Sequence, residues 1–352
     1  MCSSNESPPA GTPWYRSVSF DFTRPSEPIP CIHWLDNDSW TDMTETPFAA
    51  AHLAGRDDPA PPAAPGPAGL LTARGAWFWK TTMPETWNTV NRGLRELSFV
   101  KAWLQHPFRV TGRLLWLSGE IVVAAARYPF FCIFRSTAER PFARGLWLHH
   151  SSRRALRILG LEPRVTGSIA PHGLLVCNHL SYLDVLVLAA IAPSVFVSKD
   201  EVKSWPLFGW FARLSGTIFV HRGRRMQTRQ TADEMAAALD RGLRVVLFPE
   251  GTSSGGDTVL PFKSSLLDPA IRTARPLSVG LIGYELEDGD VVEEVCYWRD
   301  MTLVPHVMNL LSKSRIRALV RFAPWHDRTT DRKELARQLH SEILRMKQTC
   351  AL

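Results

Sequence analysis

The chain has 352 residues, 45% of them hydrophobic, so it can bury a substantial core and is not disordered as a whole. Its thirteen tryptophans and seventeen phenylalanines, at a mean hydropathy of -0.10, are typical of a protein whose rings lie at a water–lipid boundary. The net charge of +7 is uneven, because residues 1–82 carry five Lys or Arg against nine Asp or Glu, or -4, which leaves +11 for the remainder. Such a positive surface attracts anionic lipids, phosphorylated substrates or nucleic acid.

Nucleic acid is the partner that the sequence favours least. The basic part has no zinc-ligand spacing, no aromatic RNA-binding signature and no basic helix free of apolar residues. The six cysteines are scattered without a C-x-x-C pair, and the N-terminus has neither a signal-peptide pattern nor a lipid-attachment motif. We therefore expect reduced thiols, a cytoplasmic active face and no nucleic-acid partner.

Residues 1–82 are predicted to be a disordered, proline-rich region. Six of the residues between Asp58 and Pro67 are prolines or glycines, and such a composition cannot bury enough apolar surface to offset the entropy of ordering. Two explanations stay open. The region is either a gene start placed too far upstream, since Met83 follows directly, or a regulatory arm.

Residues 83–144 are predicted to be a helical membrane-attachment region. The apolar run from Leu114 to Phe134 is just long enough to cross a bilayer. Glu120 and Arg127 would each add roughly 2.5 to 3.5 kcal/mol near the centre of a spanning helix. A shallow or re-entrant hairpin therefore competes with a true crossing, and a buried pair of core helices is the third interpretation. The six arginines that follow place the next segment on the cytoplasmic side.

Residues 145–352 alternate between helical and strand patterns, which predicts an α/β sheet domain. Thr231 and Glu234 form a capping box that should begin one helix, and Gly242 should end it. The other predicted helices cover 145–159, 185–191 and 331–347, and the predicted strands cover 174–177, 195–197, 217–220, 244–248, 277–282 and 317–322.

The most informative motif is Asn178-His179-Leu180-Ser181-Tyr182-Leu183-Asp184, which lies between a predicted strand and a predicted helix. An imidazole can accept a proton from a hydroxyl near neutral pH, and a nearby carboxylate can fix its tautomer. The dipole of the following helix would keep His179 neutral. The motif thus indicates general-base catalysis, although Ser181 and Asp184 are also spaced as a capping box, which allows a purely structural interpretation.

Two later motifs carry polar groups at strand ends. In the segment from Phe248 to Ser254, Gly251 permits a sharp turn, while Thr252, Ser253 and Ser254 supply donors for phosphate or hydroxyl groups. An ordinary turn explains the glycine and the hydroxyls but leaves Glu250 unexplained.

The other motif runs from Gly216 to Arg225 and ends in Arg222, Arg224 and Arg225 around a glycine. Arginine side chains match phosphate oxygens, so these residues are candidates for an anion clamp, with a solvated basic turn as the alternative.

Four motifs in order resemble the glycerolipid acyltransferase family, typified by 1-acyl-glycerol-3-phosphate acyltransferases. The match covers about residues 170–285, and the four motifs together are specific where one alone would be weak. They are Asn178-His179-x-x-x-x-Asp184, the run from Gly216 to Arg222, the run from Phe248 to Thr252, and Pro261-Phe262-Lys263.

The resemblance implies a mixed central sheet flanked by helices and a membrane-bound enzyme at the cytoplasmic face of the inner (plasma) membrane. It implies transfer of a fatty acyl group from acyl-CoA or acyl-ACP to a lysolipid hydroxyl, with no metal and no other cofactor. His179 would be the base and Asp184 would orient it. The substrate-binding residues implied are Asn178, Arg222, Arg224, Glu250, Gly251, Thr252 and Lys263.

Two departures from the family pattern concern the acceptor. Ser253 stands where the family often has arginine, and His221 stands where it often has aspartate. The acceptor that the resemblance implies is a lysophospholipid of the 1-acyl-glycerol-3-phosphate type. These two changes raise the alternative of a zwitterionic lysolipid such as lyso-ornithine lipid. Two rival functions remain, a catalytically silent membrane-binding module and a hydrolase that uses His179 to activate water. The aromatic stretch from Trp205 to Phe211 is either core packing or a patch that dips into the bilayer.

Overall fold

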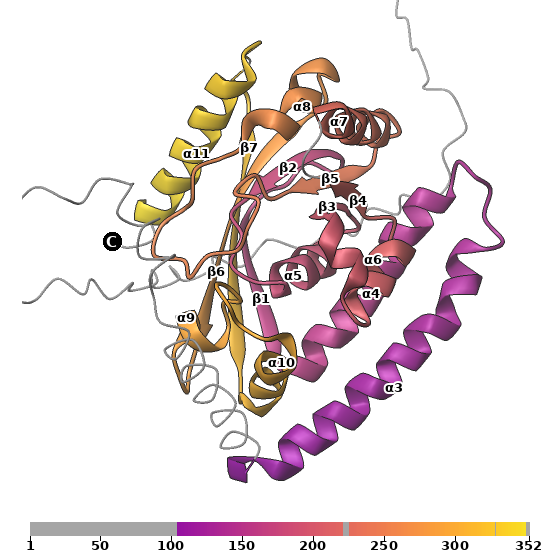
Figure 1. Ribbon diagram of the computed structural model, residues 1–352, viewed down its shortest axis with the longest axis vertical. Coiled ribbons are helices and arrows are strands. Elements are labelled where there is room, and N and C mark those ends of the chain that lie inside the picture. The colour runs from indigo at the N-terminus through magenta and orange to yellow at the C-terminus, as the bar shows by residue number, and fades with distance from the viewer. Residues whose placement is uncertain (1–103, 221–224, 328, 350–352) are drawn as a thin grey trace, which may run out of the picture.

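The computed structural model describes residues 104–220, 225–327 and 329–349. Its centre is a seven-stranded sheet in the order β1-β7-β6-β2-β5-β3-β4, with helices on both faces (Figure 1). The predicted disordered region 1–82 and the first part of the predicted membrane-attachment region lie outside the described residues. Those two predictions therefore stay predictions.

The sheet is mixed. Strands β2, β5, β3, β4 and β6 pair in parallel, whereas β7 runs antiparallel to β6 and parallel to β1. The prediction of an α/β domain with a mixed sheet is confirmed. The strands are β1 (Leu161–Gly167), β2 (Gly173–Cys177), β3 (Val195–Lys199), β4 (Ile218–Val220), β5 (Arg244–Leu247), β6 (Leu277–Leu286) and β7 (Ile316–Trp325).

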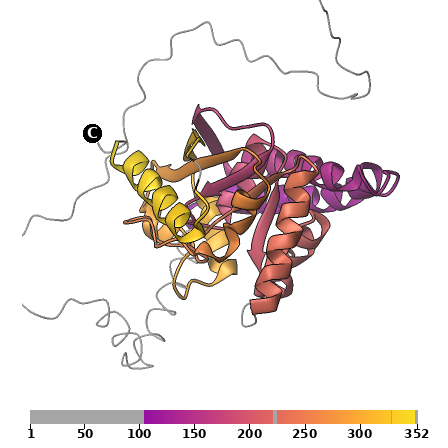
Figure 2. The same cartoon turned by 90° about the horizontal axis from the view of Figure 1, so that it is seen from above.

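Two apolar cores lie on opposite faces of the sheet, which gives three layers (Figure 2). Helices α3, α4, α5 and α10 contribute to one core, and α7, α8 and α11 to the other. The helices are α3 (Pro107–Cys132), α4 (Arg140–Leu159), α5 (Leu183–Ile191), α6 (Phe208–Leu214), α7 (Arg225–Asp240), α8 (Asp268–Arg272), α9 (Val291–Glu294), α10 (Leu303–Ser312) and α11 (Arg332–Thr349), with short 3₁₀ turns η1 (Asp200–Ser204) and η2 (Ser264–Leu266).

Strand β2 lies inside the sheet, between β5 and β6, and all of its residues are buried. An unbroken apolar run is what a parallel strand covered on both faces requires. Its first residue, Gly173, has φ +105, and a Cβ there would lie 2.1 Å from the carbonyl oxygen of Pro276. The glycine lets β2 begin in close contact with the chain that enters β6.

Helix α3 lies along α4 on the outside of the domain (Figure 1). Its inward positions recur every three or four residues and include Val110, Glu120 and Ala124. The indole of Trp147 on α4 donates to the carbonyl of Ala124 at 2.9 Å. The opposite side of α3 is apolar and exposed, and it carries Phe108, Leu115, Trp116, Val122 and Phe130.

The Glu120 carboxylate, which argued against a spanning helix, points into the protein. It is 5% exposed, and its Oε2 accepts from Arg154 Nε at 2.6 Å. By length and composition α3 is the one described helix that could cross a membrane. Because Glu120 faces α4, it does not reduce the apolarity of the exposed side of α3. Arg127, the other ionisable residue of the predicted span, is exposed.

Two sequence-based expectations differ from the structure, and a third is confirmed. Strand β1 was not predicted, because an edge strand with Pro163 and Arg164 lacks an apolar run. The capping box at Thr231 and Glu234 is wrong, because α7 begins at Arg225 and places Thr231 in the helix interior. The helix does end before Gly242, which has φ +77, as predicted.

The aromatic stretch from Trp205 to Phe211 packs partly in the core, as one of its two interpretations predicts. Phe211 stacks on Trp147 with ring centroids 5.4 Å apart, which is core packing. Leu207 and Trp210 are 43% and 40% exposed. The stretch, which leads into helix α6, therefore has one side in the core, and its contact with the bilayer stays a prediction.

The buried ion pair on α3 gives a stability prediction. Arg154→Met should lower the free energy of unfolding by about 1 to 3 kcal/mol, because it leaves the buried Glu120 charge without its partner. The double variant Glu120→Gln/Arg154→Met should recover part of that loss, since it removes the charge as well. Thermal unfolding of both variants in detergent micelles measures the difference. A double variant less stable than Arg154→Met would contradict this account.

Candidate active site

The candidate site is the loop between β2 and α5. Strand β2 ends at Cys177 and α5 begins at Leu183, so His179 lies just beyond the carboxyl end of an inner strand. Side chains and turns beyond the carboxyl ends of such strands are where α/β proteins place their reactive groups. The predicted position of His179 between a strand and a helix is correct.

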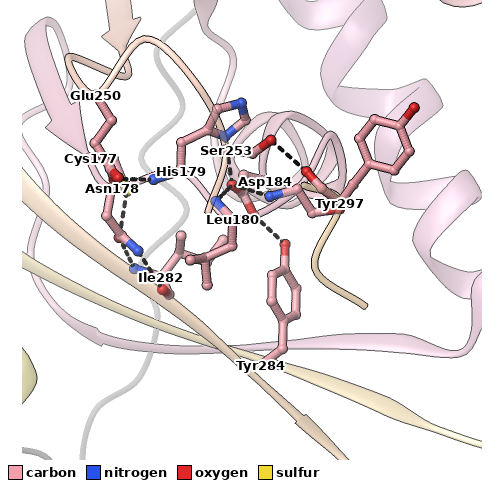
Figure 3. Close-up of polar contacts among 11 residues, drawn as sticks. Cys177, Asn178, His179, Leu180, Asp184, Glu250, Ser253, Ile282, Tyr284 and Tyr297 are labelled. Atoms are coloured by element: carbon pink, nitrogen blue, oxygen red, sulfur yellow. Dashed lines mark hydrogen bonds and ion pairs between the residues drawn. The ribbon is translucent and has the colours of Figure 1, made fainter. Parts of the chain in front are cut away.

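The structure brings His179 and Asp184 together. The imidazole Nδ1 lies 2.8 Å from Asp184 Oδ2, and the carboxylate is fully buried (Figure 3). A carboxylate accepts hydrogen bonds, so this contact assigns the Nδ1 proton and leaves Nε2 with a free lone pair. The histidine side chain is 20% exposed, and this lone pair is the group that can accept a proton from a hydroxyl.

Four donors surround the Asp184 carboxylate. Oδ2 accepts from His179 and from the main-chain N–H groups of Leu180 at 2.7 Å and Ser181 at 3.0 Å. Oδ1 accepts from the Tyr284 hydroxyl at 2.6 Å. One half of the expected capping box forms, the hydrogen bond from the Ser181 N–H to Asp184. The other half does not, because α5 has no side-chain cap at its first turn. The aspartate therefore binds both the histidine ring and the main chain of the loop.

Asn178 lies behind the histidine and is buried. Its amide NH2 donates to the carbonyl of Ile282 at 2.9 Å, and its Oδ1 accepts from the N–H of Ile282 at 2.8 Å. This pairing ties the loop to β6. Sequence reasoning assigned Asn178 to substrate binding, whereas the structure places its amide in a contact with the main chain.

Glu250 holds the histidine loop from the other side. Its Oε1 accepts from the His179 N–H at 2.8 Å, and its Oε2 accepts from the Leu260 N–H at 3.0 Å (Figure 3). Burial raises the pKa of this carboxyl from 4.5 to about 7, although the two backbone hydrogen bonds oppose that shift. Glu250 thus joins two loops, and its oxygens meet backbone donors.

The loop after Glu250 packs against the histidine. Gly251 has φ +68, a conformation that glycine adopts without strain, and its N–H donates to the carbonyl of Phe248. The Phe248 ring stacks on the imidazole with centroids 4.2 Å apart. The N–H of Ser254 donates to the His179 carbonyl at 3.0 Å. These contacts hold the ring in one orientation.

Ser253, at the position where the family often has arginine, turns into the protein. Its hydroxyl donates to the carbonyl of Tyr297, and the Tyr297 N–H donates to the carbonyl of Leu180 (Figure 3). The side chain therefore braces the histidine loop. It presents no positive charge to an acceptor.

The remaining predicted residues are less closely tied to the histidine. Thr252 and Lys263 are exposed, and the Lys263 N–H donates to the Pro249 carbonyl at 2.9 Å. Arg222 and Arg224 lie outside the described residues, as does His221. Their roles in binding substrate stay predictions.

Sequence reasoning missed an aromatic group beside the loop. The Tyr182 hydroxyl and His306 Nδ1 are 3.0 Å apart, and His306 Nε2 meets the Cys296 carbonyl at 3.2 Å. Burial lowers the pKa of His306 to about 4, so it is neutral at physiological pH. Because His306 follows no polar motif in the sequence, only the fold reveals the contact.

Within the described residues, no cluster of His, Cys, Asp or Glu is arranged to hold a metal ion.

Comparison with known proteins identifies the family of this chain. Residues 161–308 match the family model described as Acyltransferase. The lyso-ornithine lipid O-acyltransferase of Rhizobium meliloti is 36% identical, over 57% of this chain and 74% of the relative. The corresponding protein of Pseudomonas aeruginosa is 33% identical, over 54% and 74%.

Other relatives have a different acceptor in their names. The 1-acyl-sn-glycerol-3-phosphate acyltransferase of Neisseria gonorrhoeae is 36% identical over 41% of this chain and 61% of the relative. A solved structure, the 1-acyl-sn-glycerophosphate acyltransferase of Thermotoga maritima, has a TM-score of 0.53 at 18% identity. It covers 70% of this chain and 97% of that one. The match confirms the fold.

The raised pKa of Glu250 predicts a pH dependence of stability. Below about pH 4.5 the carboxyl is protonated in the folded and unfolded chains alike, whereas near pH 7 the folded chain must bury a charge that the unfolded chain leaves in water. Stability should therefore fall as pH rises from about 4.5 to about 7. Glu250→Gln should flatten this slope in thermal unfolding followed across that range.

The same variant should lower activity. Glutamine offers one acceptor oxygen, so one of the two backbone contacts is lost, and a loss of roughly tenfold in kcat is expected. An unchanged slope of stability with pH in Glu250→Gln would contradict the assignment of the raised pKa to this carboxyl.

Proposed function

The chain belongs to the glycerolipid acyltransferase family, and from this membership we propose that it acylates the free hydroxyl of a lyso-ornithine lipid. It is an acyltransferase. The proposed donor is a thioester, either acyl-CoA or acyl-ACP, and the reaction needs no metal and no other cofactor. The observation that carries the chemistry is the 2.8 Å contact of His179 Nδ1 with the buried Asp184 carboxylate.

In the proposed reaction, His179 Nε2 takes the proton from the acceptor hydroxyl as its oxygen attacks the thioester carbonyl. The carbon–sulfur bond then breaks, and the imidazolium returns the proton to the departing thiolate. Asp184 stabilises the imidazolium between these two steps. Holding both substrates beside one base makes a bimolecular reaction effectively intramolecular.

The acceptor assignment is supported by sequence and by geometry. Three relatives matched over 74 to 81% of their length carry the name lyso-ornithine lipid O-acyltransferase. Ser253 replaces an arginine that would bind phosphate, and its hydroxyl is engaged with Tyr297. A zwitterionic headgroup needs fewer cations than a phosphomonoester. Lysophosphatidate is the second candidate acceptor, because the Neisseria relatives carry that name.

We also propose that α3 lies in the membrane surface and does not cross it. Helix α3 lies along α4, and α4 exposes His150, Arg153 and Arg157. A crossing α3 would carry these side chains into hydrocarbon at high cost. An in-plane helix buries its exposed apolar side among the lipids and leaves the charges at the headgroups. The leaflet that we propose is the cytoplasmic one, which the arginines after Phe134 favour.

The catalytic proposal predicts that His179→Ala abolishes transfer, with a loss of at least about 10² in kcat, because no group replaces the base. Folding and membrane binding should be unchanged. The assay supplies lyso-ornithine lipid and lysophosphatidate separately, with acyl-CoA and with acyl-ACP. Full activity in His179→Ala would end the proposal.

The same assay identifies the acceptor and tests the rival functions. Acylated ornithine lipid supports the proposal, and acylated lysophosphatidate alone replaces it with the second candidate. Free fatty acid without acylated lipid indicates a hydrolase. No consumption of thioester indicates a binding module.

The in-plane helix predicts that Leu115→Asp and Trp116→Asp each weaken binding to anionic vesicles by at least about tenfold, since each removes a large apolar side chain from the lipid. Val165→Asp, at an exposed apolar position on β1, is the matched control. Sedimentation with vesicles measures the bound fraction. Equal binding of all three variants would contradict the proposed orientation.

A further inference from the structure

The two oxygens of Asp184 have donors of different origin. The donors to Oδ2 come from His179, Leu180 and Ser181, within five residues along the chain. The donor to Oδ1 is the hydroxyl of Tyr284, 100 residues away on β6. Figure 3 shows the ring reaching up from that strand to the carboxylate. Tyr284 therefore links the carboxylate to the sheet.

Strand β6 holds both ends of the histidine loop. The main chain of Ile282 binds the Asn178 amide, and Tyr284, two positions further along the same strand, binds Asp184. The first and last residues of the motif are thus fixed to neighbouring points on one strand. Sites built on strands are positioned more accurately than sites held by loops alone.

The environment of Tyr284 makes it a hydrogen-bond donor. The residue is 1% exposed, and burial, followed by the nearby Asp184 charge, raises the pKa of its hydroxyl well above the usual value. The phenol keeps its proton over the whole working range. Its 2.6 Å contact with Oδ1 has the length of a charge-assisted bond.

We propose that Tyr284 is a positioning residue for acyl transfer, which holds the Asp184 carboxylate turned so that Oδ2 meets the imidazole of His179. The inference rests on the function proposed above, in which His179 is the base. When Nε2 takes the acceptor proton, the anion that stabilises the imidazolium is held by the phenol. Tyr284 acts through Asp184 and not on the substrate.

Other titratable groups around Asp184 bear on the test. They are His179, Glu250 and the thiols of Cys177 and Cys296. Burial raises the pKa of both thiols, so they stay neutral. Glu250, which has a pKa of about 7, must be separated from the His179–Asp184 pair in any pH profile.

The test is Tyr284→Phe, which removes one oxygen and keeps the ring. The acidic limb is the part of the pH profile where kcat falls as the pH is lowered. It should move to higher pH by about one unit, because a carboxylate that has lost the hydrogen bond from the phenol holds a proton more tightly. We expect kcat at neutral pH to fall about tenfold or more, and KM for donor and acceptor to stay within about twofold. A residue with a merely structural role would not move the limb.

Two controls define the origin of the shift. Tyr128→Phe removes a hydroxyl from α3, outside the site, and should leave the profile unchanged. The shift should also appear when Tyr284→Phe is combined with Glu250→Gln, because Glu250 and Tyr284 hold opposite sides of the loop. An unchanged limb in Tyr284→Phe, or a loss confined to KM, overturns the inference.

A second variant decides the matter if Tyr284→Phe fails to fold. 3-Fluorotyrosine incorporated at position 284 keeps the hydroxyl and strengthens it as a donor, so the acidic limb should move to lower pH. An unmoved limb overturns the inference.

The proposed function is tested separately, since activity that survives in His179→Ala shows that His179 is not the base. An inactive His179→Ala with an unshifted Tyr284→Phe refutes only the role of Tyr284.

Discussion

A carboxylate withdrawn completely from water determines the geometry of this site. Placing the Asp184 charge in the interior carries a penalty of several kcal/mol, which its hydrogen bonds must offset. Four donors do so, and three of them belong to the loop that carries the carboxylate. Any other path of that loop would leave the charge unsatisfied. The conformation of residues 178–184 is therefore set by electrostatics as much as by packing.

The rest of the site follows from this constraint. The loop is attached at Asn178 to β6, at the His179 N–H to Glu250, and at Asp184 to Tyr284. With Phe248 stacked on the ring, the imidazole has its Nδ1 engaged and Nε2 left for chemistry. Acyl transfer by direct attack of a hydroxyl requires a base whose position and tautomer are fixed before the substrates arrive. In the proposed reaction, the loop supplies such a base.

The sequence predicted what depends on neighbours along the chain and missed what depends on distant partners. The spacing of His179 and Asp184 predicted their contact, and the apolar runs predicted the buried strands, although the edge strand β1 was missed. Glu250 and Asn178 were assigned to substrate, yet each bonds to main chain 71 or 104 positions away. Tyr284 lies in an apolar strand pattern that hides its hydroxyl. The sequence also does not show that the Glu120 side chain points toward α4, because that depends on how α3 packs against α4.

The most direct measurement of the central claim is the tautomer of His179 at neutral pH, from the ¹⁵N chemical shifts of histidine-labelled protein in micelles. The His179 signals are assigned by their absence from a His179→Asn variant. The account predicts a protonated, hydrogen-bonded Nδ1 and an unprotonated Nε2, because Asp184 accepts from Nδ1. A proton on Nε2 with Nδ1 unprotonated would contradict it, since His179 could not then serve as the base.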